Sequence, residues 1–177
     1  MIKKIGLLIG LIILGVLVYA GLKSPEYEVT RSILINAPAE KIFPYLVNQG
    51  LARKWSPWEA LDPDSKTTYW GPQEGVGAKT SWTGGKKMGT GSATITEVFL
   101  NRRVDIRLDY EEPMAMVQFA DYQINPEGNA NRVSWTVRGT NGFVERLMCL
   151  FVNMDKMVGS MFEQGLANLK TLVESQP

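Results

Sequence analysis

The hydrophobic pattern is most regular at the C-terminal end of the chain. Between Asn153 and Val173 the apolar residues recur at the spacing of one helix face, and most polar residues fall on the other side. The apolar face comprises Met154, Met157, Val158, Met161, Phe162, Gly165, Leu166, Leu169, Leu172 and Val173. This pattern predicts an amphipathic helix of about twenty residues, with Asn153 as its N-cap. We expect the helix to cover a sheet and also to close one wall of a ligand cavity.

Gly165 lies near the centre of this apolar face, although glycine inside a helix costs about 1 kcal/mol. Its position predicts either close approach of another backbone or space left for a ligand. On the second interpretation, a leucine at position 165 fits the open space. The variant is then expected to keep its stability and to lose affinity for an apolar ligand.

Strand patterns fill most of the chain before this helix. The predicted strands are Tyr27–Ile35, Thr67–Trp70, Ala78–Trp82, Ser92–Phe99, Arg103–Tyr110, Ala115–Ile124 and Arg132–Arg138. Residues 103–110 alternate strictly, which predicts one dry and one solvated face. A hairpin tip at Gly84–Lys87 and a polar turn at Asn125–Asn131 separate neighbouring strands. Short turns between consecutive strands favour antiparallel pairing.

Helical patterns outside the C-terminal helix are short. Residues 36–48 begin with Asn-Ala-Pro and predict a helix that Pro44 bends. A second helical piece is expected at Leu51–Trp55, and Gly142–Val152, apolar nearly all round, is predicted to be a buried helical lead-in to the last helix. The fold class is therefore α+β: a curved antiparallel sheet around one long C-terminal helix.

The N-terminal segment reads as a membrane helix. Lys3 and Lys4 precede 18 uncharged, mostly apolar residues, 5–22, whose helical length of about 27 Å approaches the hydrocarbon thickness. The lysines are expected to stay in the cytoplasm, which makes a single-pass inner-membrane protein with an exported, in bacteria periplasmic, domain. A signal peptide cleaved after Ala20 is the alternative. The predicted division is an anchor or signal peptide at 1–23 and a domain at 24–177.

The amino-acid composition limits which reactions and ligands are expected of this chain. The chain has no histidine, the commonest general base and metal ligand, and its single cysteine, Cys149, lies in an apolar run. The formal net charge is +1 and no basic stripe occurs, which argues against nucleic-acid binding. We expect no cofactor and no metal, and the sequence sets no oligomeric state.

Five stretches resemble one family. They are Arg31-Ser-Ile-Leu-Ile-Asn-Ala-Pro38, Trp55-Ser-Pro-Trp58, Gly75-Val-Gly-Ala78 with Trp82, Val133-Ser-Trp135, and Phe162-Glu-Gln-Gly-Leu-Ala-Asn-Leu-Lys170. The region Tyr27–Val173 is similar to the START/Bet v 1-like (SRPBCC) superfamily, nearest to its polyketide cyclase/dehydrase and lipid-transport family. The resemblance implies a helix-grip fold and a hydrophobic small molecule or lipid as ligand. It carries over no catalytic residue.

Candidate ligand-binding residues combine this expectation with the facing of side chains in the predicted elements. They are Trp55, Trp58, Tyr69, Trp82, Ile106, Leu108, Tyr110, Tyr122, Trp135, Met157, Met161 and Gly165. The primary hypothesis is a membrane-tethered, exported binding domain. Two alternatives stay open: a cyclase/aromatase-like enzyme using an inward tyrosine or Glu97, and an interaction or regulatory domain whose pocket its own side chains fill. The lack of histidine argues against the enzyme.

Overall fold

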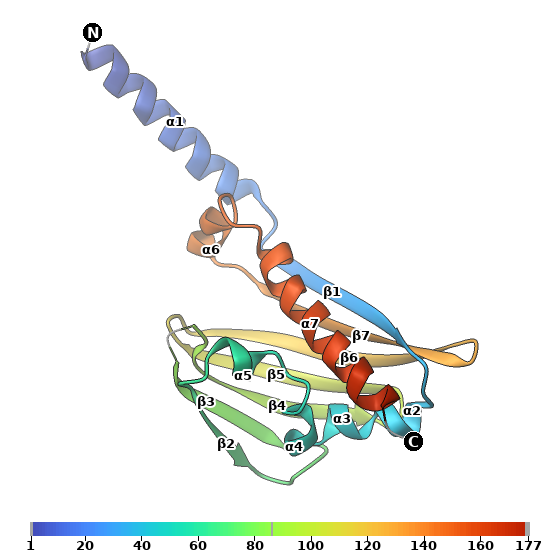
Figure 1. Cartoon of the computed structure of the whole chain (residues 1–177). Helices are drawn as coiled ribbons and strands as arrows, with labels where there is room; N and C mark the ends of the chain where they lie inside the picture. Colours follow the sequence, from blue (N-terminus) through green and yellow to red (C-terminus); the bar gives the residue numbers. More distant parts are fainter. Residues whose placement is uncertain (1, 86, 176–177) are drawn as a thin grey trace.

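One antiparallel sheet organises the domain. A computed structural model describes residues 2–85 and 87–175. In these ranges seven strands pair in the order β1-β7-β6-β5-β4-β3-β2. The strands are β1 Glu26–Ile35, β2 Lys66–Trp70, β3 Lys79–Gly85, β4 Gly89–Phe99, β5 Arg103–Glu112, β6 Met116–Glu127 and β7 Ala130–Thr140. The helices are α1 Ile2–Leu22, α2 Ala39–Ile42, α3 Pro44–Val47, α4 Gln49–Ala52, α5 Trp58–Leu61, α6 Phe143–Met148 and α7 Met154–Glu174. Figure 1 shows the sheet curving around α7.

The sequence-based prediction of strands, of the α+β class and of the long last helix is confirmed. The turn between β6 and β7 is tighter than predicted, because the two strands pair as far as Glu127 and Ala130. Gly128 makes this turn with a φ of 62°, a conformation that glycine adopts without strain. Of the predicted hairpin tip at 84–87, Lys86 lies outside the described residues, as Met1 does in the N-terminal segment.

The short helices fold the chain back under the sheet. Pro44 separates α2 from α3 as predicted, since proline cannot continue the α2 hydrogen-bond ladder. Asn48 caps α4 by accepting a hydrogen bond from the backbone N–H of Leu51 at 3.2 Å. Trp55 follows, and its Nε1 donates to the carbonyl oxygen of Tyr45 at 2.9 Å. This buried hydrogen bond fixes Trp55 against the concave face.

Polar contacts hold α7 along one edge of the sheet. At its C-terminal end, Lys170 Nζ donates to the Leu34 carbonyl oxygen at 2.6 Å. In its first ten residues, the Arg31 guanidinium on β1 forms ion pairs with Asp155 at 2.9 Å and Glu163 at 2.7 Å. The helix therefore lies along β1 and β7 (Figure 1). Space remains between it and the far strands.

The predicted buried lead-in to α7 is wrong. Within α6 no residue is buried, and Phe151 in the following turn is 80% exposed. The pattern suggested burial because the segment is apolar nearly all round. In the structure the sheet is already covered by α7, so α6 contacts the end of α1 instead: Arg146 Nη1 donates to the carbonyl oxygens of Gly21 and Lys23, both at 3.0 Å.

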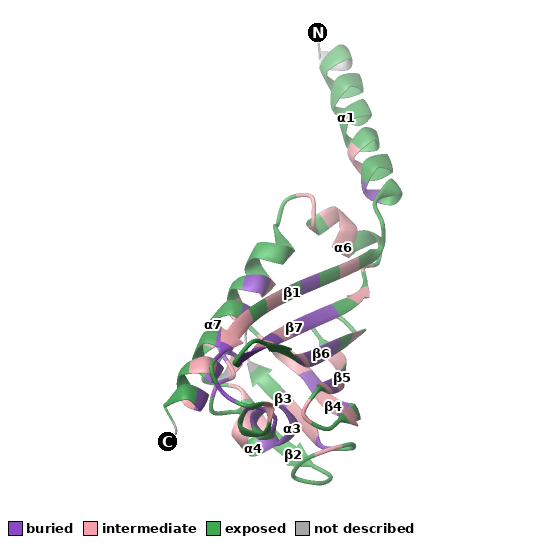
Figure 2. Cartoon of the chain, turned by 90° about the vertical axis from the view of Figure 1, so that its right-hand side faces the viewer, coloured by how far each residue is buried: buried purple, intermediate pink, exposed green. Residues whose placement is uncertain are grey.

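The N-terminal helix stands apart from the domain. Figure 2 shows α1 exposed along nearly its whole length, whereas buried residues gather where the sheet meets α7. Among the described residues it is the one helix long and apolar enough to cross a membrane, from Lys4 to Leu22. Length and composition make it a candidate span.

Candidate ligand cavity

A cavity of about 510 Å³ lies between the concave face of the sheet and the N-terminal half of α7. Strands β4, β5 and β6 supply its floor, for example through Ala93, Leu108 and Ala120. Residues of α5 form another wall. Asp62, buried directly after α5, accepts hydrogen bonds from the backbone N–H groups of Lys87 and Met88 at 2.8 and 2.9 Å, which ties this wall to the β3–β4 hairpin.

Aromatic rings separate the cavity from the packed core. Trp135 is central: its ring stacks on Phe162 with centroids 4.0 Å apart, and it meets Trp55 edge-on at 5.5 Å and Trp58 at 6.3 Å. Tyr122 completes the cluster, 5.3 Å from Trp135. Edge-on and stacked rings stabilise one another beyond their buried area. The cluster is therefore a well-packed wall on one side of the cavity.

Tyrosine hydroxyls are among the polar groups of a mostly apolar lining. Burial raises the pKa of Tyr110 to about 12 and raises that of Tyr122 further. Both hydroxyls are therefore protonated at neutral pH. They can donate a hydrogen bond to a ligand carbonyl or hydroxyl, and they are poor general bases. The charged lining residues Arg53, Lys87 and Glu112 are exposed, so charge is confined to the rim.

Methionines surround the open end of the cavity. Met114 comes from the β5–β6 connection, Met116 from the first position of β6, and Met154 and Met157 from the first turns of α7. Met154 and Met157 are 39% and 52% exposed, and Met114 is 37% exposed. Unbranched, polarizable side chains of this kind adapt to apolar groups of different shapes. We call this set the methionine rim.

Ten of the twelve candidate residues line the cavity together. They are Trp55, Trp58, Tyr69, Trp82, Ile106, Leu108, Tyr110, Tyr122, Trp135 and Met157. The sequence-based reasoning did not select Tyr27, Gln118 or Phe162, which also line it. Phe162 was already on the predicted apolar face of α7, so that signal was available. Tyr27 and Gln118 carried no signal in the local pattern.

Met161 and Gly165 do not line the cavity. The predicted open space beneath Gly165 is wrong. A Cβ there would lie 3.0 Å from Pro57 Cδ and 3.0 Å from Trp135 Cζ3. The glycine allows α7 to approach the aromatic cluster closely, which was the other interpretation. Met161 is half-buried, at the level where Phe162 brings the helix against Trp135.

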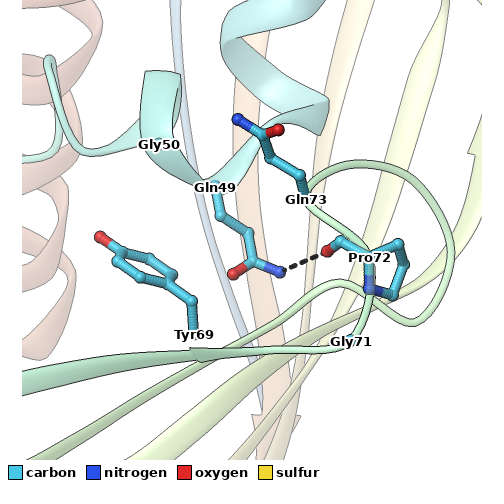
Figure 3. Close-up of a pocket in the computed structure, with 6 residues that line it drawn as sticks. All are labelled: Gln49, Gly50, Tyr69, Gly71, Pro72 and Gln73. Atoms are coloured by element: carbon cyan, nitrogen blue, oxygen red, sulfur yellow. Dashed lines mark hydrogen bonds between the residues drawn. The ribbon is translucent and has the colours of Figure 1, made fainter.

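A smaller hollow of about 300 Å³ adjoins the cavity at the edge of β2. Figure 3 shows Gln49 pointing from α4 towards the loop at Gly71 and Pro72, beside the ring of Tyr69. Its Nε2 donates to the carbonyl oxygens of Trp70 at 3.3 Å and Pro72 at 3.2 Å. Because these hydrogen bonds satisfy the amide donor, the side chain serves to hold the loop in place. In the described ranges, His, Cys, Asp and Glu side chains form no group able to hold a metal ion.

A curved antiparallel sheet gripping a C-terminal helix over an apolar cavity defines the helix-grip fold of the START/Bet v 1-like superfamily. Residues 26–174 match the family described as polyketide cyclase/dehydrase and lipid transport, and the chain belongs to this family. The family fold suggests binding of a hydrophobic ligand. Among curated proteins no sequence matches the chain.

Solved structures show the same fold at low sequence identity. CV1439 from Chromobacterium violaceum is 13% identical with a TM-score of 0.62, and the match covers 84% of this chain and 98% of that one. MLL2253 from Mesorhizobium loti is 14% identical with a TM-score of 0.63, covering 85% and 99%. Ms6760 from Mycobacterium smegmatis is 17% identical with a TM-score of 0.57, covering 84% and 91%. At such identities the likeness concerns the fold alone.

Proposed function

We propose that this protein binds a hydrophobic small molecule or lipid in the cavity, and that α1 tethers the domain to a membrane. The observation that carries the proposal is the cavity itself, about 510 Å³. Small-molecule sites range from about 300 to 1,000 Å³ and are mostly apolar with a few placed polar groups. A pocket filled by the protein's own side chains would leave no such volume.

The lining defines the chemistry of the ligand. Tyr110 and Tyr122, whose hydroxyls are protonated, line a space bounded mostly by aromatic and aliphatic side chains. A buried carboxylate or ammonium would find no opposite charge there and would be strongly penalised. The preferred ligand therefore has an apolar body and an uncharged polar group, such as a hydroxyl, carbonyl or ester, within reach of the tyrosines.

The orientation of the tether follows from the N-terminal charges. Lys3 precedes the candidate span and Lys4 is its first residue, and basic residues at the end of a span favour the cytoplasmic side. The domain then lies on the exported side of the membrane. This location suits a protein that holds apolar molecules outside the cytoplasm.

Filling the cavity tests the binding proposal. Ala93→Phe places a ring inside the cavity, whereas Thr94→Phe adds the same ring at the neighbouring position, which does not line it. The probe is a dansyl-labelled fatty alcohol added to the full chain in nanodiscs, with energy transfer from the cavity tryptophans as the signal. We expect Ala93→Phe to weaken probe binding at least tenfold and Thr94→Phe to leave it within twofold.

Melting temperatures show that both variants are folded. Leu108→Trp, on the strand paired with Ala93, repeats the test should Ala93→Phe unfold. Equal probe binding by the parent, Ala93→Phe and Leu108→Trp would place the probe outside the cavity and overturn the proposal.

A further inference from the structure

The segment of the chain that connects β7 to α7 presents an exposed apolar surface. It consists of α6 and the turn that follows it, residues 143–152, which we call the interfacial segment. Its exposed apolar side chains are Phe143, Val144, Met148, Phe151 and Val152. In the part of the chain that the structure describes, no other element covers them. A contiguous exposed apolar patch marks an interaction site or a membrane contact.

The interfacial segment sits at the end of the candidate membrane span. Arg146 donates to the carbonyl oxygens of Gly21 and Lys23, and a Cβ on Gly21 would lie 3.9 Å from Phe143 Cε2. The 21 residues of α1 rise about 31 Å, close to the hydrocarbon thickness of about 30 Å. With Lys4 at one side of the bilayer, residues 21–23 reach the opposite membrane–water interface, and the interfacial segment reaches it with them.

The cavity opens at this same end of the domain. Gln118 and Tyr27, which line the cavity, are both paired with Gly139 near the end of β7. Asn141, just before α6, donates its backbone N–H to the Pro25 carbonyl oxygen at 2.7 Å. The start of β1, the end of β7, the interfacial segment and the first turns of α7 therefore lie together, and Figure 1 shows α1 leaving the domain there.

We propose that the interfacial segment rests in the membrane–water interface and holds the methionine rim against the bilayer, so that the ligand passes directly between membrane and cavity. The inference rests on the proposed tether and cavity. A lipid surface is favoured over a protein partner because the patch is continuous with α1, whose own apolar surface needs hydrocarbon. Arg146, beside the ring of Phe143 at 5.9 Å, gives the segment the mixture of apolar and basic groups found in interfacial helices.

Nitroxide labels on the full chain in nanodiscs test the contact. In a Cys149→Ser background, single labels replace Phe151, Leu11 in α1, and Asn129 at the far β6–β7 turn. We expect positions 151 and 11 to collide readily with oxygen and poorly with a water-soluble nickel complex, and position 129 to do the reverse. Nickel accessibility at 151 equal to that at 129 overturns the proposal. Low accessibility to both reagents at 151 indicates a covering protein, such as a second copy, and also overturns it.

Transfer kinetics test the functional consequence. Val144→Asp with Phe151→Asp is expected to slow uptake of the dansyl alcohol from donor vesicles at least tenfold while leaving equilibrium affinity within twofold. The matched control is Val117→Asp with Phe119→Asp, since these exposed apolar residues lie on the outer face of β6, away from the cavity. Unchanged uptake by the first pair, or equal slowing by both, contradicts the inference.

The two proposals fail in different ways. If Ala93→Phe binds the probe as well as the parent does, the cavity is not the binding site, and this holds for any accessibility of the nitroxide labels. Normal probe binding with a nickel-accessible position 151 removes only the membrane contact. A nickel-accessible position 11 shows that α1 does not span, which removes both the tether and the contact but leaves the binding site.

Discussion

One apolar face runs the whole length of α7, but its two halves are buried to different extents. We compare the N-terminal half, Met154–Met161, with the C-terminal half, Phe162–Glu174. In the first half Met154 and Met157 are largely exposed at the cavity rim, whereas in the second Leu166 and Leu169 are 1% and 0% exposed. The first half borders the cavity, and the second half, beyond Phe162, packs in the core. If the cavity binds a ligand as proposed, one helix contributes to binding at one end and to stability at the other.

The cause of this difference lies on β1. The Arg31 guanidinium bonds to Asp155 in the first half and to Glu163 at the start of the second half, and so holds the first half at the sheet edge. Gly159 makes room for it, because a Cβ there would collide with the Arg31 guanidinium. Four residues beyond Met161, Gly165 lets the helix descend onto Trp135 and Pro57. The two glycines mark where the helix changes neighbours.

The largest expected effect contrasts the two halves directly. Leu169→Ala removes a fully buried side chain from the core half and should lower the free energy of unfolding by about 2–5 kcal/mol. Met157→Ala, on the rim half, should cost less than about 1 kcal/mol but should weaken binding of the dansyl alcohol. Denaturant titration and probe titration of both variants measure the contrast. Equal stability losses would show that the halves do not differ.

A smaller effect is expected at the boundary between the halves. Gly165→Leu forces a side chain against Pro57 and Trp135, and such overpacking costs about 1–3 kcal/mol. Ala167→Leu places a leucine side chain on the exposed face of the same helix and serves as the control. A lower melting temperature for Gly165→Leu alone supports close packing. Parent-like stability of Gly165→Leu, with weakened probe binding, would restore the open-space interpretation.

The smallest effect concerns the ion pair between Arg31 and Asp155, which holds the N-terminal half of α7 on the sheet edge. Hydrogen bonding from Arg31 keeps the pKa of Asp155 below its ordinary 3.8. A folded-state pKa below the unfolded one stabilises the fold above that unfolded pKa, and this contribution is lost as the pH falls through the folded pKa. Arg31→Gln should therefore reduce the loss of stability between pH 5 and about pH 2.

Melting temperatures across this pH range provide the measurement. Lys66→Gln, which removes one exposed charge on β2 at the opposite edge of the sheet, controls for net charge. Parallel curves for Arg31→Gln and the parent would mean that the Arg31–Asp155 pair contributes nothing to the pH dependence. Because Asp155 and Glu163 are largely exposed, the effect should be modest and should weaken in high salt.

Local periodicity was enough to predict most of the architecture. Alternation over residues 103–110 and helical spacing over residues 154–173 depend on neighbours within a few positions, so they are legible in the chain itself. The apolar run before Lys23 likewise predicts a candidate span by length alone. The aromatic candidates line the cavity together, although no local pattern fixed which way their side chains face.

Long-range contacts decided the remainder. Periodicity identifies the apolar face of α7 but does not say which residues lie opposite it. The sequence therefore allowed an open space beneath Gly165, whereas the structure places Pro57 and Trp135 there. Long-range packing also decides the burial of α6. An apolar segment is buried only if an uncovered apolar surface is within reach, and α7 already covers this part of the sheet. The position of α6 beside Gly21 joins residues more than a hundred positions apart. Such a contact is set by the packing of the whole domain, and no local pattern encodes it.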